Sequence, residues 1–356
     1  MRSLGLVIHG GRPAAVATGE RARAWAAEHG VTVTDLDVWN ADWITGPQRR
    51  HAAEEAAAAG PLDVIVTIGG DGTFLRGVRL AAAADAVVLG VNVGRVGFLT
   101  EVRPDEVVEA LDAVHDGTAP IEERMTLTLR ASRALHLPDG MEALLRYGRG
   151  PALPPPQPRG GTPEQDGWGV PLAVTAVNDV VFEKLARDRQ ISIGLYIGAR
   201  HFASYSADAV VVASPTGSTA YSFAAGGPVL SPRLNAIVFT PVAPHMVFDR
   251  SIVLAGDEIA GVQVLPQSGQ VAVSVDGQLR GVMDPGDWTA VHASPWRARL
   301  VRLRPVDFYG RLRERFGLAD AAAALADGPA PRAFRPTQPP PDDLKGLQLP
   351  GWPPAP

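Results

Sequence analysis

Apolar and polar positions alternate in two different ways along the chain, and the change comes near residue 120. Before it, short apolar, β-branched runs are separated by stretches rich in helix-forming residues. The runs predict strands over residues 4–8, 31–38, 64–68 and 86–92. The stretches between them predict helices over residues 14–29, 52–59, 73–84 and 104–115. Strands that alternate with helices indicate a parallel sheet covered on both faces.

After residue 120 the predicted strands follow one another closely, with short turns between them. Residues 191–197 show the pattern best, because large apolar residues alternate there with smaller or polar ones. This alternation is typical of an antiparallel sheet with one buried face. The strands are predicted over residues 121–131, 172–182, 191–197, 200–206, 209–213, 252–254, 262–265, 271–275 and 299–303. One helix is expected to begin near Gly217.

These patterns predict the α/β fold class, with an N-terminal doubly wound parallel α/β domain and a C-terminal, mainly antiparallel β domain. The first domain is expected to span residues 1–120 and the second residues 121–300. Residues 301–318 are expected to return to the first domain. The boundary between the domains is therefore crossed more than once.

Two segments differ from the rest in composition. Residues 133–171 form an insertion in the second domain, dense in Pro and Gly from residue 151, and residues 319–356 form a Pro-rich tail. Both lack the apolar content that would offset the entropy of ordering the chain. We therefore predict a mobile loop and a disordered tail. Docking of a partner through a polyproline helix is the alternative.

Composition limits the partners and the compartment. The 356 residues carry a net charge of −5 and have a pI near 5.9, which argues against nucleic acid or an anionic membrane as the main partner. A phosphorylated small molecule remains compatible, because Arg76, Arg79 and Arg95 supply local positive charge. The absence of cysteine excludes disulfides and thiolate chemistry. With no signal peptide and no apolar run of about 18 residues, we predict a cytoplasmic protein.

Candidate chemistry begins at residues 64–75, which read VIVTIGGDGTFL. An apolar strand runs into Gly69, Gly70 and Gly72, and a helix follows directly. Backbone N–H groups can close on phosphate oxygens where no Cβ blocks them, and a helix N-terminus favours negative charge. Because a carboxylate repels phosphate, we expect Asp71 to face a hydroxyl group or a metal ion. The alternative is a tight turn in which aspartate is common.

A second glycine-rich stretch, GVNVGRVGFL at residues 90–99, follows the next predicted strand. Ligands collect at the carboxyl ends of parallel strands. Residues 69–73 and 92–98 are therefore expected at the same edge of the sheet. The second stretch fits a ligand-binding loop and a simple crossover of the chain equally well.

A hydroxyl-rich stretch lies in the second half, where residues 208–228 read DAVVVASPTGSTAYSFAAGGP. Thr216, Ser218, Thr219 and Ser222 offer hydroxyl groups to a polar ligand, and Tyr221 offers a flat face to a base. A helix N-cap needs fewer such side chains, which favours a ligand site. No cluster of histidines and carboxylates in the sequence indicates a dedicated metal cage.

Five blocks in this order resemble the NAD kinase family over about residues 4–317. They are GGDGT at 69–73, GVNVGRVGFL at 90–99, NDVV at 178–181, ASPTGSTAYSFAAGGP at 213–228 and DGQ at 276–278. GGDGT alone is shared with diacylglycerol-kinase-like lipid kinases and is similar to a loop of phosphofructokinases. PTGSTAYS followed by DGQ is far more specific to NAD kinases.

The resemblance implies a role for each matching residue. Asp71 matches the proton acceptor for the 2′-hydroxyl of the adenosine ribose, and Asn178 and Asp179 match a dinucleotide-binding pair. The candidate cofactor-binding residues from the loops and the resemblance are Gly69, Gly70, Gly72, Thr73, Arg76, Phe98, Asn178, Asp179, Arg189, Ser206, Asp208, Thr216, Thr219, Ala220, Tyr221, Ser222, Phe223, Ala224, Ala243 and Gln278. Ala209 departs from the pattern, since glycine is usual there.

The implied reaction transfers the γ-phosphoryl of ATP, or a terminal phosphoryl of polyphosphate, to the 2′-hydroxyl of NAD, giving NADP. Mg²⁺ or another divalent cation is expected on the donor phosphates. The resemblance also implies a homodimer or homotetramer in which a neighbouring subunit contributes to the site. The rival hypotheses are a lipid or sugar kinase with the same loop and a non-catalytic dinucleotide-binding regulator. ATP or polyphosphate, and NAD or NADH, remain open as substrates.

Overall fold

A computed structural model of the chain describes residues 1–36, 60–94, 97–138, 156, 158, 169–185, 189–246, 248–304 and 307–318. The chain divides into two compact units, Met1–Leu303 and Arg304–Pro356. The predicted helix at 52–59, the end of the predicted strand at 31–38, Arg95, most of the predicted insertion and the predicted tail lie outside the described residues. None of the described helices is long and apolar enough to cross a membrane.

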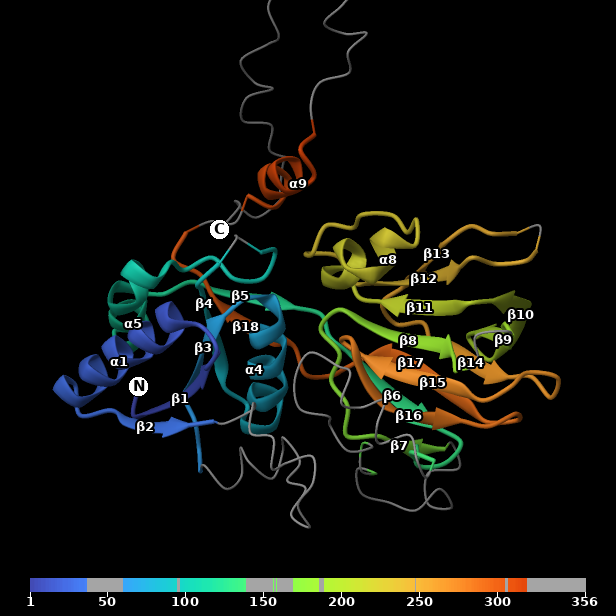
Figure 1. Ribbon diagram of the computed structural model, residues 1–356, viewed down its shortest axis with the longest axis horizontal. Helices are drawn as coiled ribbons and strands as arrows, with labels where there is room; N and C mark the ends of the chain where they lie inside the picture. Colours follow the sequence, from blue (N-terminus) through green and yellow to red (C-terminus); the bar gives the residue numbers. More distant parts are fainter. Residues whose placement is uncertain are drawn as a thin grey trace, which may run out of the picture. The chain divides into compact units, whose positions relative to one another are not determined.

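A six-stranded sheet organises the first part of the larger unit (Figure 1). Its strand order is β2-β1-β3-β4-β18-β5, and its pairs are parallel except for β18 with β5. The strands are β1 (Ser3–Ile8), β2 (Thr32–Asp35), β3 (Val64–Gly69), β4 (Val87–Asn92), β5 (Ile121–Arg124) and β18 (Ala298–Val301). The predicted parallel α/β part of the fold is confirmed, and a strand near residue 300 completes it.

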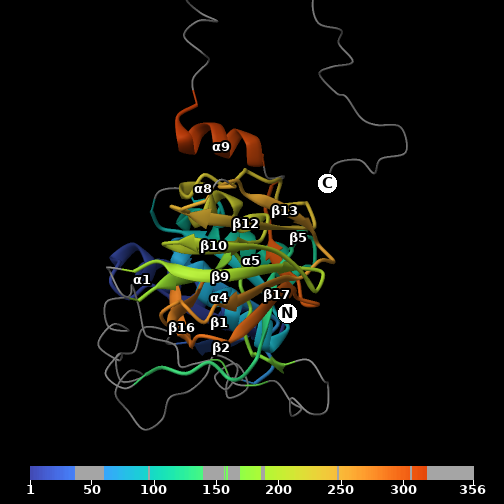
Figure 2. The same cartoon turned by 90° about the vertical axis from the view of Figure 1, so that its right-hand side faces the viewer.

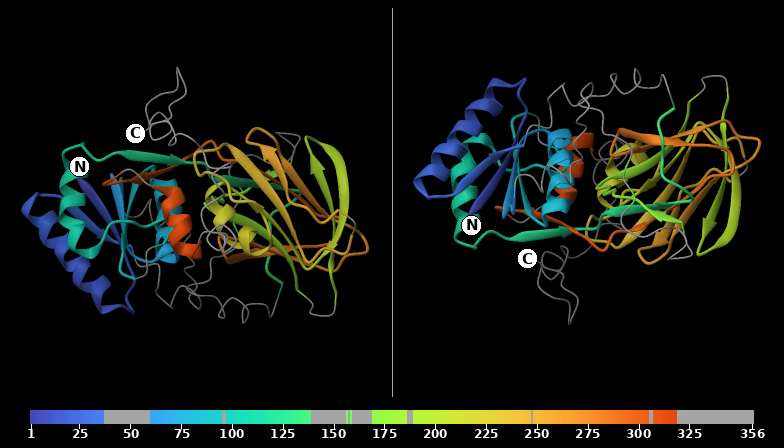
Figure 3. Two further views of the ribbon diagram at one scale, coloured as in Figure 1. Left: turned by 90° about the horizontal axis from the view of Figure 1, so that it is seen from above. Right: turned by 90° about the horizontal axis from the view of Figure 1, so that it is seen from below.

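Helices cover both faces of this sheet (Figure 3). α1 (Pro13–Glu28) and α5 (Val107–His115) share a buried cluster with Val66, and α4 (Asp71–Ala84) shares another with Ile65. Successive side chains of β3 therefore alternate between two apolar environments. This explains why the strand reads as a continuous apolar run rather than an alternating one.

Two further six-stranded sheets are antiparallel and share one buried core (Figures 1 and 2). Their orders are β10-β9-β14-β17-β6-β7 and β13-β12-β11-β8-β15-β16. Leu195 and Val262 of the first sheet share the core with Phe182 and Phe239 of the second. The strands are β6 (Leu127–Ala131), β7 (Val170–Pro171), β8 (Asp179–Lys184), β9 (Ile191–Ile197), β10 (Arg200–Ala207), β11 (Ala209–Ala213), β12 (Ala236–Val242), β13 (Ile252–Ala255), β14 (Ala260–Val264), β15 (Val271–Val275), β16 (Gln278–Met283) and β17 (Trp288–Ala293).

The strand predicted over residues 121–131 is wrong as a single element. It is two strands in different sheets, because β5 pairs with β18 whereas β6 pairs with β17. The break falls at Met125 and Thr126, and the Thr126 hydroxyl donates to the carbonyl of Trp296 at 2.6 Å. The two halves differ in burial, because β6 is mostly buried whereas only Arg124 is buried in β5, so one strand pattern does not describe both.

Other differences come from irregular backbone. Only Asp179–Lys184 of the segment predicted around 172–182 forms a full strand, and Leu172 and Ala176 form isolated bridges. The predicted helix at 104–115 begins as a 3-10 turn, η1 (Pro104–Glu106). The helix expected near Gly217 is two short pieces, η2 (Thr216–Thr219) and α8 (Tyr221–Ala224).

In the smaller unit, helix α9 spans Phe308–Phe316. Asp307, the residue before it, caps the helix, because its side chain accepts the Gly310 N–H at 2.8 Å.

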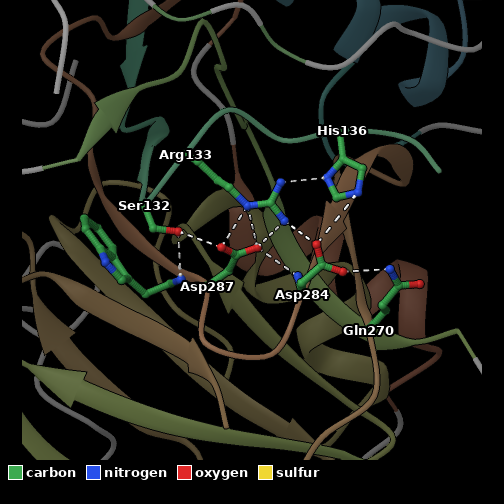
Figure 4. Close-up of polar contacts among 7 residues, drawn as sticks. Ser132, Arg133, His136, Gln270, Asp284 and Asp287 are labelled. Atoms are coloured by element: carbon green, nitrogen blue, oxygen red, sulfur yellow. Dashed lines mark hydrogen bonds and ion pairs between the residues drawn. The ribbon is translucent and has the colours of Figure 1, made fainter. Parts of the chain in front are cut away.

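A polar cluster holds the loop after β6 to the turn between β16 and β17 (Figure 4). Arg133 donates to both carboxylate oxygens of Asp287, at 2.7 to 3.1 Å, and also pairs with Asp284. Asp287 further accepts the Ser132 hydroxyl at 3.1 Å and the Asp284 N–H at 2.8 Å. Asp287 is therefore the acceptor on which three residues converge.

We expect Asp287→Ala to lower the free energy of unfolding by about 1–2 kcal/mol, a charge-assisted hydrogen-bond contribution discounted for the exposure of Arg133. Partial burial acts to raise the pKa of Asp287, but the hydrogen bonds and charge of Arg133 outweigh it and lower the pKa below its usual 3.8. The stabilisation is therefore present above that value and disappears as pH falls through the lowered pKa.

Urea unfolding at pH 7 and at pH 3 measures this difference. Asp249→Ala is the matched control, because Asp249 pairs with Arg250 at an exposed position and should contribute almost nothing. A loss for Asp287→Ala that is as large at pH 3 as at pH 7 would contradict the assignment.

Candidate active site

Asp71 is the first residue of helix α4 and stands directly after the glycines that end strand β3. Gly69 is required by packing, since a Cβ there would lie 2.3 Å from the Thr73 hydroxyl oxygen. Gly70 and Gly72 differ, because a Cβ at either position would meet no atom within 4 Å. The folded chain itself therefore does not require glycine at these two positions, and close approach of a ligand would explain it.

The Asp71 carboxylate lies against the second glycine-rich stretch. It accepts the Phe98 N–H at 3.2 Å and the Thr100 hydroxyl at 3.4 Å. A Cβ on Gly97 would lie 2.1 Å from a carboxylate oxygen, so only glycine allows this approach. Strands β3 and β4 end side by side, and the Val93 N–H donates to the carbonyl of Gly69 at 3.0 Å. The two stretches thus meet at the carboxyl edge of the sheet.

These contrasts predict the effect of one substitution. We expect Gly72→Ala to leave the unfolding temperature unchanged or slightly higher, because alanine favours a helix more than glycine by about 1 kcal/mol. The added methyl group enters the space open to a ligand, so nucleotide affinity should fall at least about tenfold, a 1.4 kcal/mol loss. Calorimetric titration with ATP and NAD measures the affinity. Unchanged affinity for both nucleotides would show that Gly72 faces no ligand.

The backbone of Asn178 is held between two turns from different parts of the chain. Ser214 N–H donates to the Asn178 carbonyl at 2.8 Å, and a Cβ on Gly217 would lie 2.0 Å from the same oxygen. On the other side, the Asp276 carboxylate accepts the N–H of Asn178 at 2.8 Å. Three of the five sequence blocks are therefore assembled around this one residue.

Asp179 is 4% exposed and accepts the backbone N–H of Tyr221. Burial is the main cause that raises the pKa of Asp179 to about 7, and the negative charge of Asp276 adds to it. Tyr221 is 41% exposed, and burial with the charges of nearby Glu183, Asp179 and Asp208 raises the pKa of its phenol. The tyrosine ring therefore stands at the surface above a group of carboxylates.

Helix α4 and the segment before β8 share a buried cluster, which contains Val177 together with Leu75 and Val78. This connects the helix that begins at Asp71 with the residue before Asn178. Arg76 on the same helix is almost fully buried, and burial with the charge of Arg79 lowers the pKa of Arg76 to about 10. The surroundings of this helix are thus rich in positive charge.

Arg124 is a site residue that the sequence interpretation missed. It is 3% exposed, pairs with Glu122 at 2.7 Å and donates to the Thr216 hydroxyl at 3.5 Å. Arg302 binds the same Glu122 at 2.6 Å. Strand β5 therefore supports the hydroxyl-rich turn. Glu122 and Arg124, two charged residues spaced two apart in a strand, were the available signal.

The remaining predicted residues divide by what their side chains contact. The Ser222 hydroxyl is buried against the Thr240 hydroxyl at 2.9 Å, and the Ser206 hydroxyl donates to Gln190 at 2.7 Å. Asp208 pairs with Lys184 at 2.6 Å. Exposed positions include Arg189, Phe223, Ala224 and Ala243, and Thr219 and Ala220 are partly exposed.

Gln278 completes the group around the Asp276 turn. Its side-chain oxygen is buried and has no hydrogen-bond partner in the described part of the chain. An acceptor in that state fits a site for a ligand donor group. Across the described ranges, no group of three or more His, Asp or Glu side chains is placed to hold a metal ion.

A glycine loop at the carboxyl edge of a parallel sheet, with a carboxylate at its helix N-terminus and a hydroxyl-rich turn held against Asn178, is typical of a nucleotide-binding phosphotransferase. Matches to models of known protein families identify which kind of phosphotransferase this is. The model for the ATP-NAD kinase N-terminal domain matches residues 4–119, and that for the ATP-NAD kinase C-terminal domain matches residues 177–303. The chain belongs to the NAD kinase family.

Curated relatives agree with this assignment. The chain is 61% identical over 350 residues to NAD kinase 1 of Streptomyces avermitilis. The matched region covers 98% of this chain and 97% of that protein. It is 35% identical over 315 residues to the NAD kinase of Symbiobacterium thermophilum, covering 88% and 99% of the two chains.

Two solved structures share the fold at 21% identity. Yeast NADH kinase complexed with NADH gives a TM-score of 0.67 and covers 90% of this chain and 89% of that one. An NAD kinase from Archaeoglobus fulgidus in complex with ATP gives a TM-score of 0.58 and covers 89% and 98%.

Proposed function

We propose that the protein transfers the γ-phosphoryl of ATP, or a terminal phosphoryl of polyphosphate, to the 2′-hydroxyl of the adenosine ribose of NAD, giving NADP. The observation that carries this proposal is the placement of Asp71 at a helix N-terminus beside two glycines that the folded chain does not itself require. Membership of the NAD kinase family supports it. Membership of this family also argues against the two rival hypotheses, a lipid or sugar kinase and a non-catalytic dinucleotide-binding regulator.

In this mechanism Asp71 orients the ribose hydroxyl and finally accepts its proton. A carboxylate offers about four lone-pair positions, and the Phe98 N–H and Thr100 hydroxyl occupy two of them. The remaining positions can accept the substrate hydroxyl. Phosphoryl transfer passes through a loose transition state, so the hydroxyl becomes acidic only as the new bond forms, and a weak base is sufficient at that stage.

The dinucleotide is proposed to lie across the turn built from Asn178, Asp179 and the hydroxyl-rich segment. No side-chain hydrogen bond of Asn178 is found among the described residues, so its amide is available to a ligand. The exposed ring of Tyr221 offers a stacking face for a base. The buried oxygen of Gln278 offers an acceptor. Each of these assignments is part of the proposal.

The donor is proposed to arrive with Mg²⁺ on its phosphates, in the manner usual for this cation. The positive end of helix α4 and the free N–H groups of the glycine loop suit those phosphates. A cytoplasmic location and a homodimer or homotetramer remain part of the same proposal. A neighbouring subunit would then contribute to each site.

A coupled assay with purified protein tests the function. NAD or NADH is the acceptor, and Mg-ATP or polyphosphate is the donor. We expect NADP to form with NAD and Mg-ATP and to disappear with EDTA. Diacylglycerol and fructose 6-phosphate serve as rival acceptors. Phosphorylation of either of these without formation of NADP, or binding of NAD without turnover, would favour one of the rival hypotheses.

A further inference from the structure

Asp276 lies in the turn between β15 and β16, and its carboxylate accepts three successive backbone N–H groups. These belong to Val177 at 3.1 Å, Asn178 at 2.8 Å and Asp179 at 3.3 Å. The Asp276 N–H in turn donates to the carbonyl of Asp179 at 3.0 Å. One side chain therefore fixes the backbone that presents Asn178 and Asp179.

Turn chemistry alone gives a simpler explanation for this aspartate. Val275 pairs with Gln278, so Asp276 and Gly277 are the two residues of a hairpin loop. Their φ values of 48° and 73° are those of a type I′ turn, in which Asn-Gly and Asp-Gly are both favoured. If the turn were the only requirement, asparagine at position 276 would serve as well as aspartate.

The charge of Asp276 has partners that asparagine would not satisfy. Arg79 of helix α4 and Arg280 of β16 lie close enough to interact electrostatically with Asp276. Arg280 is 8% exposed, and its Nε has no hydrogen-bond partner in the described part of the chain. The two arginines repel each other, and the negative charge of Asp276 favours the charged form of both. Burial raises the pKa of Asp276 itself, which the charge of Arg79 and the three N–H groups oppose.

Arg79 follows Asp71 on the same helix by eight residues, so the charge of Asp276 acts on the helix that begins at Asp71 as well as on the backbone of Asn178 and Asp179.

We propose that Asp276 is a positioning residue of this kinase, whose carboxylate holds the Val177–Asp179 backbone in place for the dinucleotide and links it electrostatically to Arg79 on helix α4. The inference rests on the proposed function, because it concerns the acceptor side of that site. It assigns Asp276 no contact with the reacting atoms. Its effect should therefore appear in NAD binding rather than in the donor or the chemical step.

The test compares Asp276→Asn with the full-length wild-type chain. We expect KM for NAD to rise at least about tenfold, because the negative charge and one of the two oxygens that accept the three N–H groups are lost. KM for ATP should change less than about twofold and kcat less than about threefold, because neither depends on this backbone. Asp257→Asn is the matched control, an exposed aspartate in the turn between β13 and β14, and should behave as wild type.

Amide hydrogen exchange gives a second readout that does not depend on turnover. The N–H groups of Val177 and Asn178 should exchange slowly in the wild type and at least about ten times faster in Asp276→Asn, while Phe182 in the following strand β8 stays protected. If Asp276→Asn fails to fold, amide hydrogen exchange in the wild-type protein alone tests the proposal. Slow exchange at Val177 and Asn178 supports the proposal, and exchange as fast as at exposed Gly277 overturns it.

Two kinetic results would also overturn the proposal. One is a KM for NAD in Asp276→Asn equal to that of the wild type. The geometry of the type I′ turn would then be the sole requirement at position 276. The other is an equal rise of both KM values with a lower unfolding temperature, which would indicate general damage. Failure of the wild type to form NADP would count against the proposed function instead, and calorimetric NAD binding with the exchange data would still test Asp276.

Discussion

Asp71→Asn is expected to lower kcat at least about a hundredfold, in keeping with the loss of general-base assistance. The amide oxygen can still accept the Phe98 N–H, and the amide NH2 can donate to the Thr100 hydroxyl oxygen. The loop geometry and the unfolding temperature should therefore stay close to those of the wild type. It cannot take a proton from the ribose hydroxyl. KM for NAD should therefore change little, because the lost interaction develops in the transition state.

Steady-state kinetics with both substrates varied measures these constants. Asp85→Asn is the matched control, because Asp85 ends the same helix with φ of 51°, a conformation that asparagine also adopts readily. Asp85 pairs with Arg299 far along the helix from the glycine loop, so kcat should be unchanged. Turnover near the wild-type value in Asp71→Asn would remove Asp71 from the catalytic role.

The second large effect is expected from Gly97→Ala, which alters the position of Asp71 without changing it. The new Cβ would lie 2.1 to 2.4 Å from the carboxylate atoms, so the side chain or the loop must move. Misplacement of a reacting group by about 1 Å can cost on the order of a hundredfold in rate. We therefore expect kcat to fall ten- to a hundredfold, roughly.

Gly94→Ala is the control in the same loop, because its Cβ would meet only the flexible end of Arg12, at 2.8 Å. The double variant Asp71→Asn with Gly97→Ala separates the two possible causes. If Gly97→Ala acts through the carboxylate, adding it to Asp71→Asn should lower kcat by less than about threefold more. If Gly97→Ala lowers kcat in the double variant by as much as it does alone, the loop affects the reaction by a route other than the position of the Asp71 carboxylate.

Much of the architecture could be predicted from local patterns because local and tertiary requirements agree there. Strand β3 is buried on both faces by different helices, so its continuous apolar run was a reliable signal. Strand β9 has one buried face, so its alternation was equally clear. The glycines at positions 69 to 72 could be interpreted as a ligand loop because few other needs explain three glycines between a strand and a helix.

The missed strands either have an interrupted local pattern or pair with a strand far away in the sequence, as β17 does with β6. Strand β12 was not predicted, and Pro241 inside it argued against a strand. Pro241 is tolerated because β13 pairs only with Ala236–Phe239, so the proline lies beyond the end of that ladder. The strands β16 and β17 were also missed, and a bulge with Gly281 at φ of 156° interrupts the pattern of β16.

The same distinction holds for the site. The hydroxyl-rich turn was found from its composition, but the residues that support it were not. Arg124 contacts Thr216 and Asp276 contacts Asn178 over separations of 92 and 98 residues in the sequence. Asp-Gly in a turn already has a sufficient local explanation, so nothing in the sequence signalled the three N–H groups that the carboxylate accepts.

The most direct test of the central role of Asp71 is the distance between its carboxylate and the ribose 2′-hydroxyl. A crystal structure with NAD, Mg²⁺ and a non-hydrolysable ATP analogue would measure it. We expect a separation of about 2.6–3.2 Å, with the terminal phosphate of the analogue on the opposite side of the hydroxyl. A hydroxyl more than about 4 Å from Asp71, with no bridging water and with another side chain in contact with it, would contradict the account.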